Sequence, residues 1–240
     1  KKETTMYSFD SRIRYSEVDK DQKMDLYSII NYFQDCTTFH SEDIGKGIDY
    51  LQSRKRVWII NSWQIIVNRF PILGEKITIT TWPYEFKSMY GYRNFTITDS
   101  KHQVVAAANS IWVLMDTETN HPTKVTEDDI IGYNSHERFD MEYGPRKVPI
   151  PKSLTTLEKF RVIRSNIDTN NHVNNGQYIK MAEEFLPAGF RIRQMRAEYK
   201  KSAVLGDIIV PKISFEKGTF TVVLACTDDT PYTIIEFLKA

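Results

Sequence analysis

The segment RIRYSEVDKDQKMDLYSIINYFQD (Arg12–Asp35) returns 149 positions later, without a gap, as RVIRSNIDTNNHVNNGQYIKMAEE (Arg161–Glu184). Identical residues stand at Arg12, Ser16 and Asp19, and apolar positions correspond as well. A second pair follows in the same order, because FPILGEKITIT, from position 70, resembles SAVLGDIIVPK, from position 202. Two ordered matches in each half indicate an internal duplication.

Each half shows the same order of elements. A short strand leads into a polar turn, and apolar residues at spacings of three and four then predict helices over about 26–43 and 174–186, the second ending before Pro187. Long alternating segments follow and predict antiparallel strands, with turns at LGE, LGD and EKG. A sheet curled around one helix in each half is an α+β architecture.

The segment between the halves has the composition of a linker. SHERFDMEYGPRKVPIPK, residues 135–152, contains three prolines, a glycine and mixed charge. We therefore predict one domain over 1–134, a linker over 135–153 and a second domain over 154–240.

Composition excludes several functional classes. Of 240 residues, 41% are hydrophobic and the formal net charge is +1, so we expect no nucleic-acid partner. No run of about 18 apolar residues occurs, so we expect no membrane span. Cys36 and Cys226 are too few for a disulfide framework, and their apolar surroundings predict buried thiols in a reducing, cytoplasmic compartment.

The second polar turn, IDTNNHVNN (Ile167–Asn175), concentrates groups that can serve structure or chemistry. Asn174 or Asn175 can cap the following helix, and Asp168 and Asn170 can each bond the backbone of their own turn. Each residue taken singly favours this structural interpretation.

Taken together, the side chains of this turn also suit acyl transfer to water. A carboxylate, an amide and the His172 imidazole stand at a helix N-terminus, where unpaired N–H groups can stabilise an oxyanion. The first turn, VDKDQKMDL, places Asp21 opposite Asn170 and Lys23 opposite His172. Only the second turn therefore has the side chains that hydrolysis needs.

Metal and cofactor sites are not expected. DKDQKMD lacks the glycine and the final glutamate of a calcium loop, since Met24 and Ile30 occupy those positions. The five histidines lie far apart, and neither HxxxH nor CxxC occurs.

The stretch DTNNHVNNGQY (Asp168–Tyr178) resembles the D-x-N-x-H-V-N-N-x-x-Y signature of acyl–acyl carrier protein thioesterases. ANSIWVLMDTET (Ala108–Thr119) and AEYKKSAVLGD (Ala197–Asp207) are similar to further family segments, so the resemblance covers most of the chain. It implies a double hotdog fold and hydrolysis of fatty acyl-carrier thioesters at the end of fatty-acid synthesis, without a cofactor.

The resemblance also implies roles for individual residues. Asp168, Asn170 and His172 match the motif's catalytic positions, and whether Asp168 or His172 takes the proton is left open. The backbone N–H groups of Val173 and Asn174 are the expected oxyanion donors. The family often has Glu, and in plants Cys, where this chain has Ser202 and Ala203, so direct attack by water fits better than a covalent intermediate.

Two binding regions are expected as well. An acidic carrier protein predicts a basic docking site, and a solvated charged face is the alternative for the candidates Lys180, Arg191, Arg193, Arg196, Lys200 and Lys201. The fatty acyl chain is expected in the first half, and plain core packing is the alternative for its candidate liners Trp58, Ile60, Trp63 and Trp112. Assembly into a homodimer is left open.

Three rival functions share the expected fold. A hotdog thioesterase acting on acyl-CoA would need a phosphate pocket in place of a broad basic surface. A hotdog hydratase would use an Asp and a His on 2-enoyl thioesters, although the HVNN entry to the helix resembles thioesterases. A non-catalytic acyl-binding module would explain Ser202 in the position of the family glutamate.

Overall fold

The computed structural model describes residues 6–240, so the first five residues of the first predicted domain lie outside it. Internal contacts divide the chain into two compact units. Of the described residues, the first unit contains 6–61 and 67–143, and the second contains 62–66 and 144–240. The predicted linker is thus divided at Tyr143 and Gly144.

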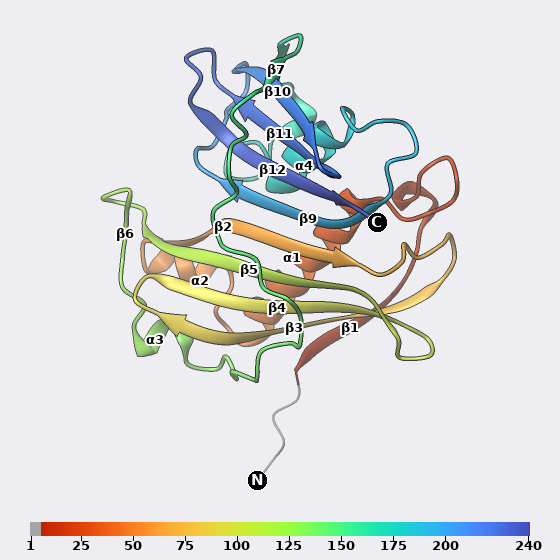
Figure 1. Ribbon diagram of the computed structural model, residues 1–240. Coiled ribbons are helices and arrows are strands. Elements are labelled where there is room, and N and C mark those ends of the chain that lie inside the picture. The colour runs from red at the N-terminus through yellow and green to blue at the C-terminus, as the bar shows by residue number, and fades with distance from the viewer. Residues whose placement is uncertain (1–5) are drawn as a thin grey trace. The chain divides into compact units, whose positions relative to one another are not determined.

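The first unit is an antiparallel sheet with one long helix (Figure 1). Its strands follow the order β1-β3-β4-β5-β2, and β6 pairs with β5. The strands are β1 (Tyr7–Arg12), β2 (Arg56–Val67), β3 (Lys76–Lys87), β4 (Tyr90–Asp99), β5 (Val104–Asp116) and β6 (His121–Pro122). The helices are η1 (Tyr15–Glu17), α1 (Leu26–Asp43), α2 (Ile48–Ser53) and α3 (Glu127–Ile130).

Helix α1 occupies the predicted range and buries one apolar stripe against this sheet. The Asp25 side chain caps it by accepting the Ser28 N–H at 2.7 Å. Phe33 is fully buried, with its ring centroid 5.0 Å from that of Phe95 on β4. Burying a side chain of this size stabilises the fold by about 1.5–3 kcal/mol.

The second unit repeats this arrangement with a shorter helix (Figure 1). Residues 62–66 of β2 pair with β9, and the order continues β9-β12-β11-β10-β7, with β8 also on β10. Its elements are β7 (Thr155–Thr156), β8 (Phe160–Arg161), η2 (Arg164–Asn166), α4 (Asn175–Glu183), β9 (Ile192–Tyr199), β10 (Ile208–Glu216), β11 (Thr219–Ala225) and β12 (Pro231–Lys239).

Helix α4 ends three residues before the predicted limit of 186. The N–H groups of Phe185 and Leu186 donate to the carbonyls of Ala182 and Glu183, three residues back. This tight turn precedes Pro187, because a residue before proline is disfavoured in helical geometry.

The duplication is visible in the backbone hydrogen bonds of the two halves. Met24 N–H donates to Pro71 O at 2.8 Å, and Val173 N–H donates to Ala203 O at 2.9 Å. The LGE and LGD turns also match, with positive φ angles of 80° at Gly74 and 88° at Gly206. Each unit is a helix wrapped by an antiparallel sheet, so the predicted double hotdog fold is confirmed.

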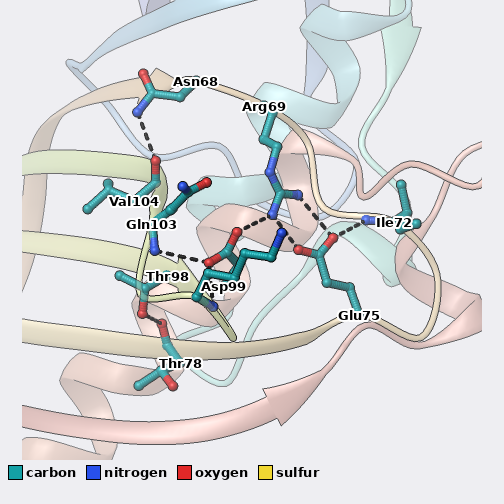
Figure 2. A network of polar contacts seen from close by, with 10 residues as sticks. Asn68, Arg69, Ile72, Glu75, Thr78, Thr98, Asp99, Gln103 and Val104 are labelled. Carbon is teal, nitrogen blue, oxygen red and sulfur yellow. Dashed lines mark hydrogen bonds and ion pairs between the residues drawn. The ribbon is translucent and has the colours of Figure 1, made fainter.

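A charged network stabilises the LGE turn of the first unit (Figure 2). Arg69 donates to both carboxylate oxygens of Glu75 and, at 2.8 Å, to Asp99. Hydrogen bonding to Arg69 lowers the pKa of Glu75, and the Gln103 N–H followed by Arg69 lowers that of Asp99. Glu75 also accepts the Ile72 N–H at 2.9 Å, so the network holds the loop that pairs with the first polar turn.

Neither cysteine is exposed, as predicted. Cys36 and Cys226 are 0% and 7% exposed, and burial raises the pKa of the Cys36 thiol to about 12. Across residues 6–240, the helices are too short or too polar to cross a membrane.

Candidate active site

Asp168 organises the second polar turn through its side chain and its backbone. Its Oδ1 accepts the Asn170 N–H at 2.8 Å, and its own N–H donates to His172 O at 2.8 Å. Asn171 N–H closes the turn onto Asp168 O at 3.1 Å, with Asn171 at a positive φ of 62°. Asp168 therefore makes the predicted side-chain turn.

Asp19 builds the first turn with the corresponding bonds, and its Oδ1 also accepts the Lys23 N–H at 3.0 Å. Its Oδ1 accepts the Asp21 N–H at 2.8 Å, its N–H donates to Lys23 O at 2.8 Å, and Gln22 has a φ of 60°. Turn-making thus explains the aspartate in both halves. It does not explain why Asn170 and His172 replace Asp21 and Lys23.

The side chains of Asn170 and His172 are exposed and make no hydrogen bond within the described part of the chain. Asp168 is half-buried, and its Oδ2 has no hydrogen-bond partner among residues 6–240. The structure therefore places three polar groups on one turn, and the turn itself requires only Asp168 Oδ1.

The helix terminus corrects the prediction for the oxyanion donors. Val173 N–H already donates to Ala203 O and Asn174 N–H to Asn166 O, both at 2.9 Å, so the prediction that they are available is wrong. The Asn174 side chain is the predicted cap and accepts the Gly176 N–H at 2.9 Å. Asn175 N–H, at the first residue of α4, has no acceptor among residues 6–240.

Ser202 lies beside the polar turn, because the backbone C=O and N–H of its neighbour Ala203 both make hydrogen bonds there. Ala203 O accepts the Val173 N–H, and Ala203 N–H donates to the Tyr178 hydroxyl at 2.8 Å. Ser202 is exposed next to this buried junction. The structure therefore brings together two of the three segments that carry the family resemblance, those of residues 168–178 and 197–207.

Tyr178 is a positioning residue; the sequence placed it in the helix and at the end of the family signature but gave its hydroxyl no role. In the first half, Ile29 aligns with Tyr178 and has no hydroxyl. Pro71 aligns with Ala203 and has no N–H that would need an acceptor. Ala203 has that N–H and is buried, so it needs the Tyr178 oxygen. The repeat alignment contained this signal, since Pro71 aligns with Ala203.

Replacing Tyr178 with phenylalanine is expected to destabilise the protein by about 1–3 kcal/mol, because the buried Ala203 N–H loses its acceptor. Calorimetric unfolding measures the change. The double variant with Ala203→Pro removes the orphaned donor, as in the first half, and should recover part of the loss. An equal loss in both variants would show that the hydroxyl is not needed for this bond.

The six basic residues do not form one surface. Arg196 is 8% exposed, pairs with Glu236 at 3.3 Å and donates to Lys147 O, so its predicted role in docking is wrong. Arg191 and Arg193 stand at one end of β9 and Lys200 and Lys201 at the other, about 30 Å apart at the rise of a strand. Lys180 and these four are exposed.

Lys200 and Lys201 differ in their surroundings. Lys200 Nζ is 3.0 Å from the carboxylate of the buried Glu198. Lys201 Nζ lies 3.7 Å from Cys226 Sγ and 5.6 Å from the centre of the Tyr232 ring. Lys201 is therefore the cation at this end of β9 without a carboxylate at ion-pair distance in the described chain.

The predicted liners of the acyl chain are divided between the units. Trp58, Ile60 and Trp112 belong to the first unit, whereas Trp63 falls in the segment 62–66 of the second. Ile60 and Trp63 are 2% exposed, and Trp58 and Trp112 are half-buried. Among residues 6–240 no group of three or more His, Cys, Asp or Glu side chains could hold a metal ion.

Solved structures with this fold cover nearly the whole chain. An acyl-ACP thioesterase from Bacteroides thetaiotaomicron is 20% identical, with 97% of each chain covered and a TM-score of 0.90. A 12:0-ACP thioesterase from Umbellularia californica is 17% identical, with 99% of this chain and 98% of that one covered and a TM-score of 0.83. At these identities the likeness shows the fold.

Plant relatives are similar in sequence over part of their length. The FATB2 acyl-[acyl-carrier-protein] hydrolase, chloroplastic, of Cuphea viscosissima is 26% identical over 188 residues, which are 73% of this chain and 46% of that protein. The chain thus spans about half the length of such relatives.

Two family profiles match the chain in order. The profile described as the acyl-ACP thioesterase N-terminal domain matches residues 4–133, and that of the C-terminal domain matches residues 151–229. The first profile alone covers more than half of the chain, and the second contains the polar turn of Asp168. The chain therefore belongs to the acyl-ACP thioesterase family.

Proposed function

We propose that the protein hydrolyses fatty acyl thioesters of acyl carrier protein to free fatty acid and carrier, and so ends fatty-acid synthesis. The observation that carries the proposal is the comparison of its two turns. They share one scheme of backbone hydrogen bonds, yet only the second has an exposed imidazole and amide beside a helix N-terminus. Family membership and the names of the plant hydrolases support it.

In the proposed reaction, water attacks the thioester carbonyl directly. His172 takes the proton, since histidine is the side chain that most often serves as a general base. Asp168 Oδ2 holds the water or stabilises the imidazolium, and Asn170 orients the carbonyl. The C–S bond then breaks, the acid leaves with the new C–O bond, and the proton passes to the departing thiolate.

Asn175 N–H replaces the two N–H groups first expected to bind the oxyanion. It is at the first residue of α4, where the helix dipole is positive, and it has no acceptor among residues 6–240. A developing oxyanion would supply that acceptor. Ser202 and Ala203 provide neither a carboxylate nor a thiol, which supports direct attack by water over a covalent intermediate.

Release of free thiol tests the proposal. The purified protein is mixed with acyl-carrier, acyl-CoA and short acyl thioester substrates of the same chain length, and thiol is followed with a chromogenic disulfide. We expect turnover with the highest kcat/KM on the carrier substrate. A higher kcat/KM on acyl-CoA would favour the CoA thioesterase, and acyl binding without thiol release would favour a binding module.

Lys200 and Lys201 are proposed to dock the acidic carrier. Reversing both charges with Lys200→Glu and Lys201→Glu is expected to raise KM for the carrier substrate by about tenfold or more, because the loss of electrostatic steering slows association. KM for a short acyl thioester should change less than about twofold, since electrostatic steering acts on the acidic carrier, which this substrate lacks.

The matched control for docking is Lys159→Glu, which reverses an exposed lysine before β8. It should leave KM for both substrates unchanged. If the carrier and the short substrate respond equally to the double reversal, the two lysines do not form a docking site.

The acyl chain is proposed to lie in the first unit, along Trp58, Ile60 and Trp112. A reducing cytoplasmic compartment and assembly into a homodimer stay predictions of the sequence.

A further inference from the structure

Arg93, in the middle of β4, is a buried cation without a counter-charge. It is 6% exposed, and residues 6–240 place no carboxylate at ion-pair distance from it. Three other buried charged side chains do have such partners, in the pairs Arg196–Glu236, Glu198–Lys200 and Asp99–Arg69, whereas the buried Asp129 is bonded to the cap residue Thr126. Burying an unpaired charge costs several kcal/mol, so its presence points to a missing anion.

The protein groups around Arg93 do not neutralise it. One guanidinium nitrogen, Nη1, lies 3.0 Å from His40 Nδ1 and 3.2 Å from Thr81 Oγ1, and the Tyr133 ring centre is 5.4 Å from the guanidinium carbon. Arginine only donates, so His40 Nδ1 accepts and the ring is neutral. Burial and the nearby Arg93 lower the pKa of His40 to about 4, in agreement with a neutral imidazole.

The unused donors of Arg93 are arranged for a carboxylate. Both bonds to protein use Nη1, and the Nε and Nη2 hydrogens have no acceptor within the described chain. Nε and Nη2 lie on one edge of the planar guanidinium and match the two oxygens of a carboxylate.

Aromatic rings continue from this polar group into an apolar row. The Tyr133 and Phe86 ring centres are 5.9 Å apart, and those of Phe86 and Trp58 are 6.2 Å apart. All three side chains are half-buried. Gly91 makes room for this row, because a Cβ there would lie 3.3 Å from the Trp58 ring.

We propose that Arg93, with His40 and Thr81, forms a carboxylate-binding site in the first unit, for a ligand whose apolar chain lies along Tyr133, Phe86 and Trp58. Two sources share this chemistry: a free fatty acid, and the far end of an acyl substrate that carries a second carboxyl group. Binding of the carboxylate does not depend on the proposed hydrolysis.

Calorimetric titration with decanoate and with 1-decanol tests the site, because the two probes differ in the charged end. We expect the native protein to bind decanoate at least about tenfold more tightly, since hydrogen bonds to charged groups exceed neutral ones by this order. Arg93→Met should lose the preference. Arg138→Met is the matched control, because Arg138 is an exposed arginine of the same unit, stacked 3.6 Å from the Tyr143 ring centre, and it should keep the preference.

Equal binding of the two probes by the native protein would overturn the proposal, as would a preference that survives in Arg93→Met. Without ligand, Arg93→Met should melt no lower than the native protein, because it removes an unneutralised buried charge. Should that variant not fold, Arg93→Lys decides: it keeps the charge but loses the two-pronged geometry, so we expect a weaker preference for decanoate. An undiminished preference in Arg93→Lys would contradict the assigned geometry.

Two further measurements separate the sources. If the site serves free fatty acid, decanoate should inhibit turnover of a short thioester in the native protein more than in Arg93→Met. If it serves a substrate, the native protein should hydrolyse an ω-carboxydecanoyl thioester faster than Arg93→Met does, with decanoyl thioester unaffected. Absence of all hydrolysis would refute the proposed function and leave the titration as the test of the site.

Discussion

Replacing His172 with alanine is expected to lower kcat by on the order of 10²–10⁴, the usual contribution of a general base. The same change should leave the thermal midpoint nearly unaltered. The imidazole is exposed and makes no hydrogen bond within residues 6–240, and exposed positions of this kind shift stability by roughly 0.5 kcal/mol or less. A large loss of rate at constant stability would therefore show that the imidazole acts in the reaction and not in folding.

The duplication provides the control at the equivalent place. Lys23 stands in the first turn where His172 stands in the second, and both carbonyls accept the N–H of the turn aspartate at 2.8 Å. Lys23→Ala should keep kcat within about threefold, because the proposed reaction uses no side chain of the first turn and Lys23 is an exposed residue. Both variants are assayed with acyl-carrier substrate and melted by calorimetry. Full activity of His172→Ala would remove the main support for the enzyme.

Replacing Asp168 with asparagine is expected to lower kcat by on the order of 10² and to change stability little. Asparagine keeps the oxygen that accepts the Asn170 N–H, so the turn is preserved. What it loses is the negative charge at Oδ2, which has no partner in the described chain and is proposed to act on the water or on protonated His172.

Asp19→Asn makes the same exchange in the first turn, where the carboxylate accepts the Asp21 N–H at the same distance of 2.8 Å. It should change the thermal midpoint by the same small amount and leave kcat within about threefold. If Asp168→Asn unfolds the protein while His172→Ala stays fully active, the stretch is a turn and a helix cap only.

Sequence reasoning located the polar turn but misjudged its backbone. Four amides and an imidazole before an apolar stripe correctly indicated a capped helix, and Asn174 is the cap. The same pattern led to Val173 and Asn174 as oxyanion donors, but their N–H groups are taken by Ala203 and Asn166. The Val173 bond joins residues thirty positions apart and depends on the tertiary structure, so no local pattern could reveal it, whereas the Asn174 bond closes the polar loop over eight positions.

The prediction that six basic residues form one docking site overlooked the tertiary structure in a similar way. Residues 191–201 lie close together in sequence, but β9 stretches them over about 30 Å, since a strand rises about 3.3 Å per residue. Alternation along the strand also turned Arg196 inward, where it pairs with Glu236 and donates a hydrogen bond to Lys147 O. Charge density in sequence therefore overestimated charge density on the surface.

The sequence by itself determined the duplication, the extent of α1, the antiparallel strands and the turn with Asp168, Asn170 and His172. These features follow from spacing and turn chemistry, which act between residues near one another in the chain. Only the tertiary structure decided which groups remain available: Asn175 N–H, Asp168 Oδ2 and the Arg93 guanidinium edge. A polar group is available only if no distant residue bonds to it in the folded chain. Burial makes each polar group without such a partner costly.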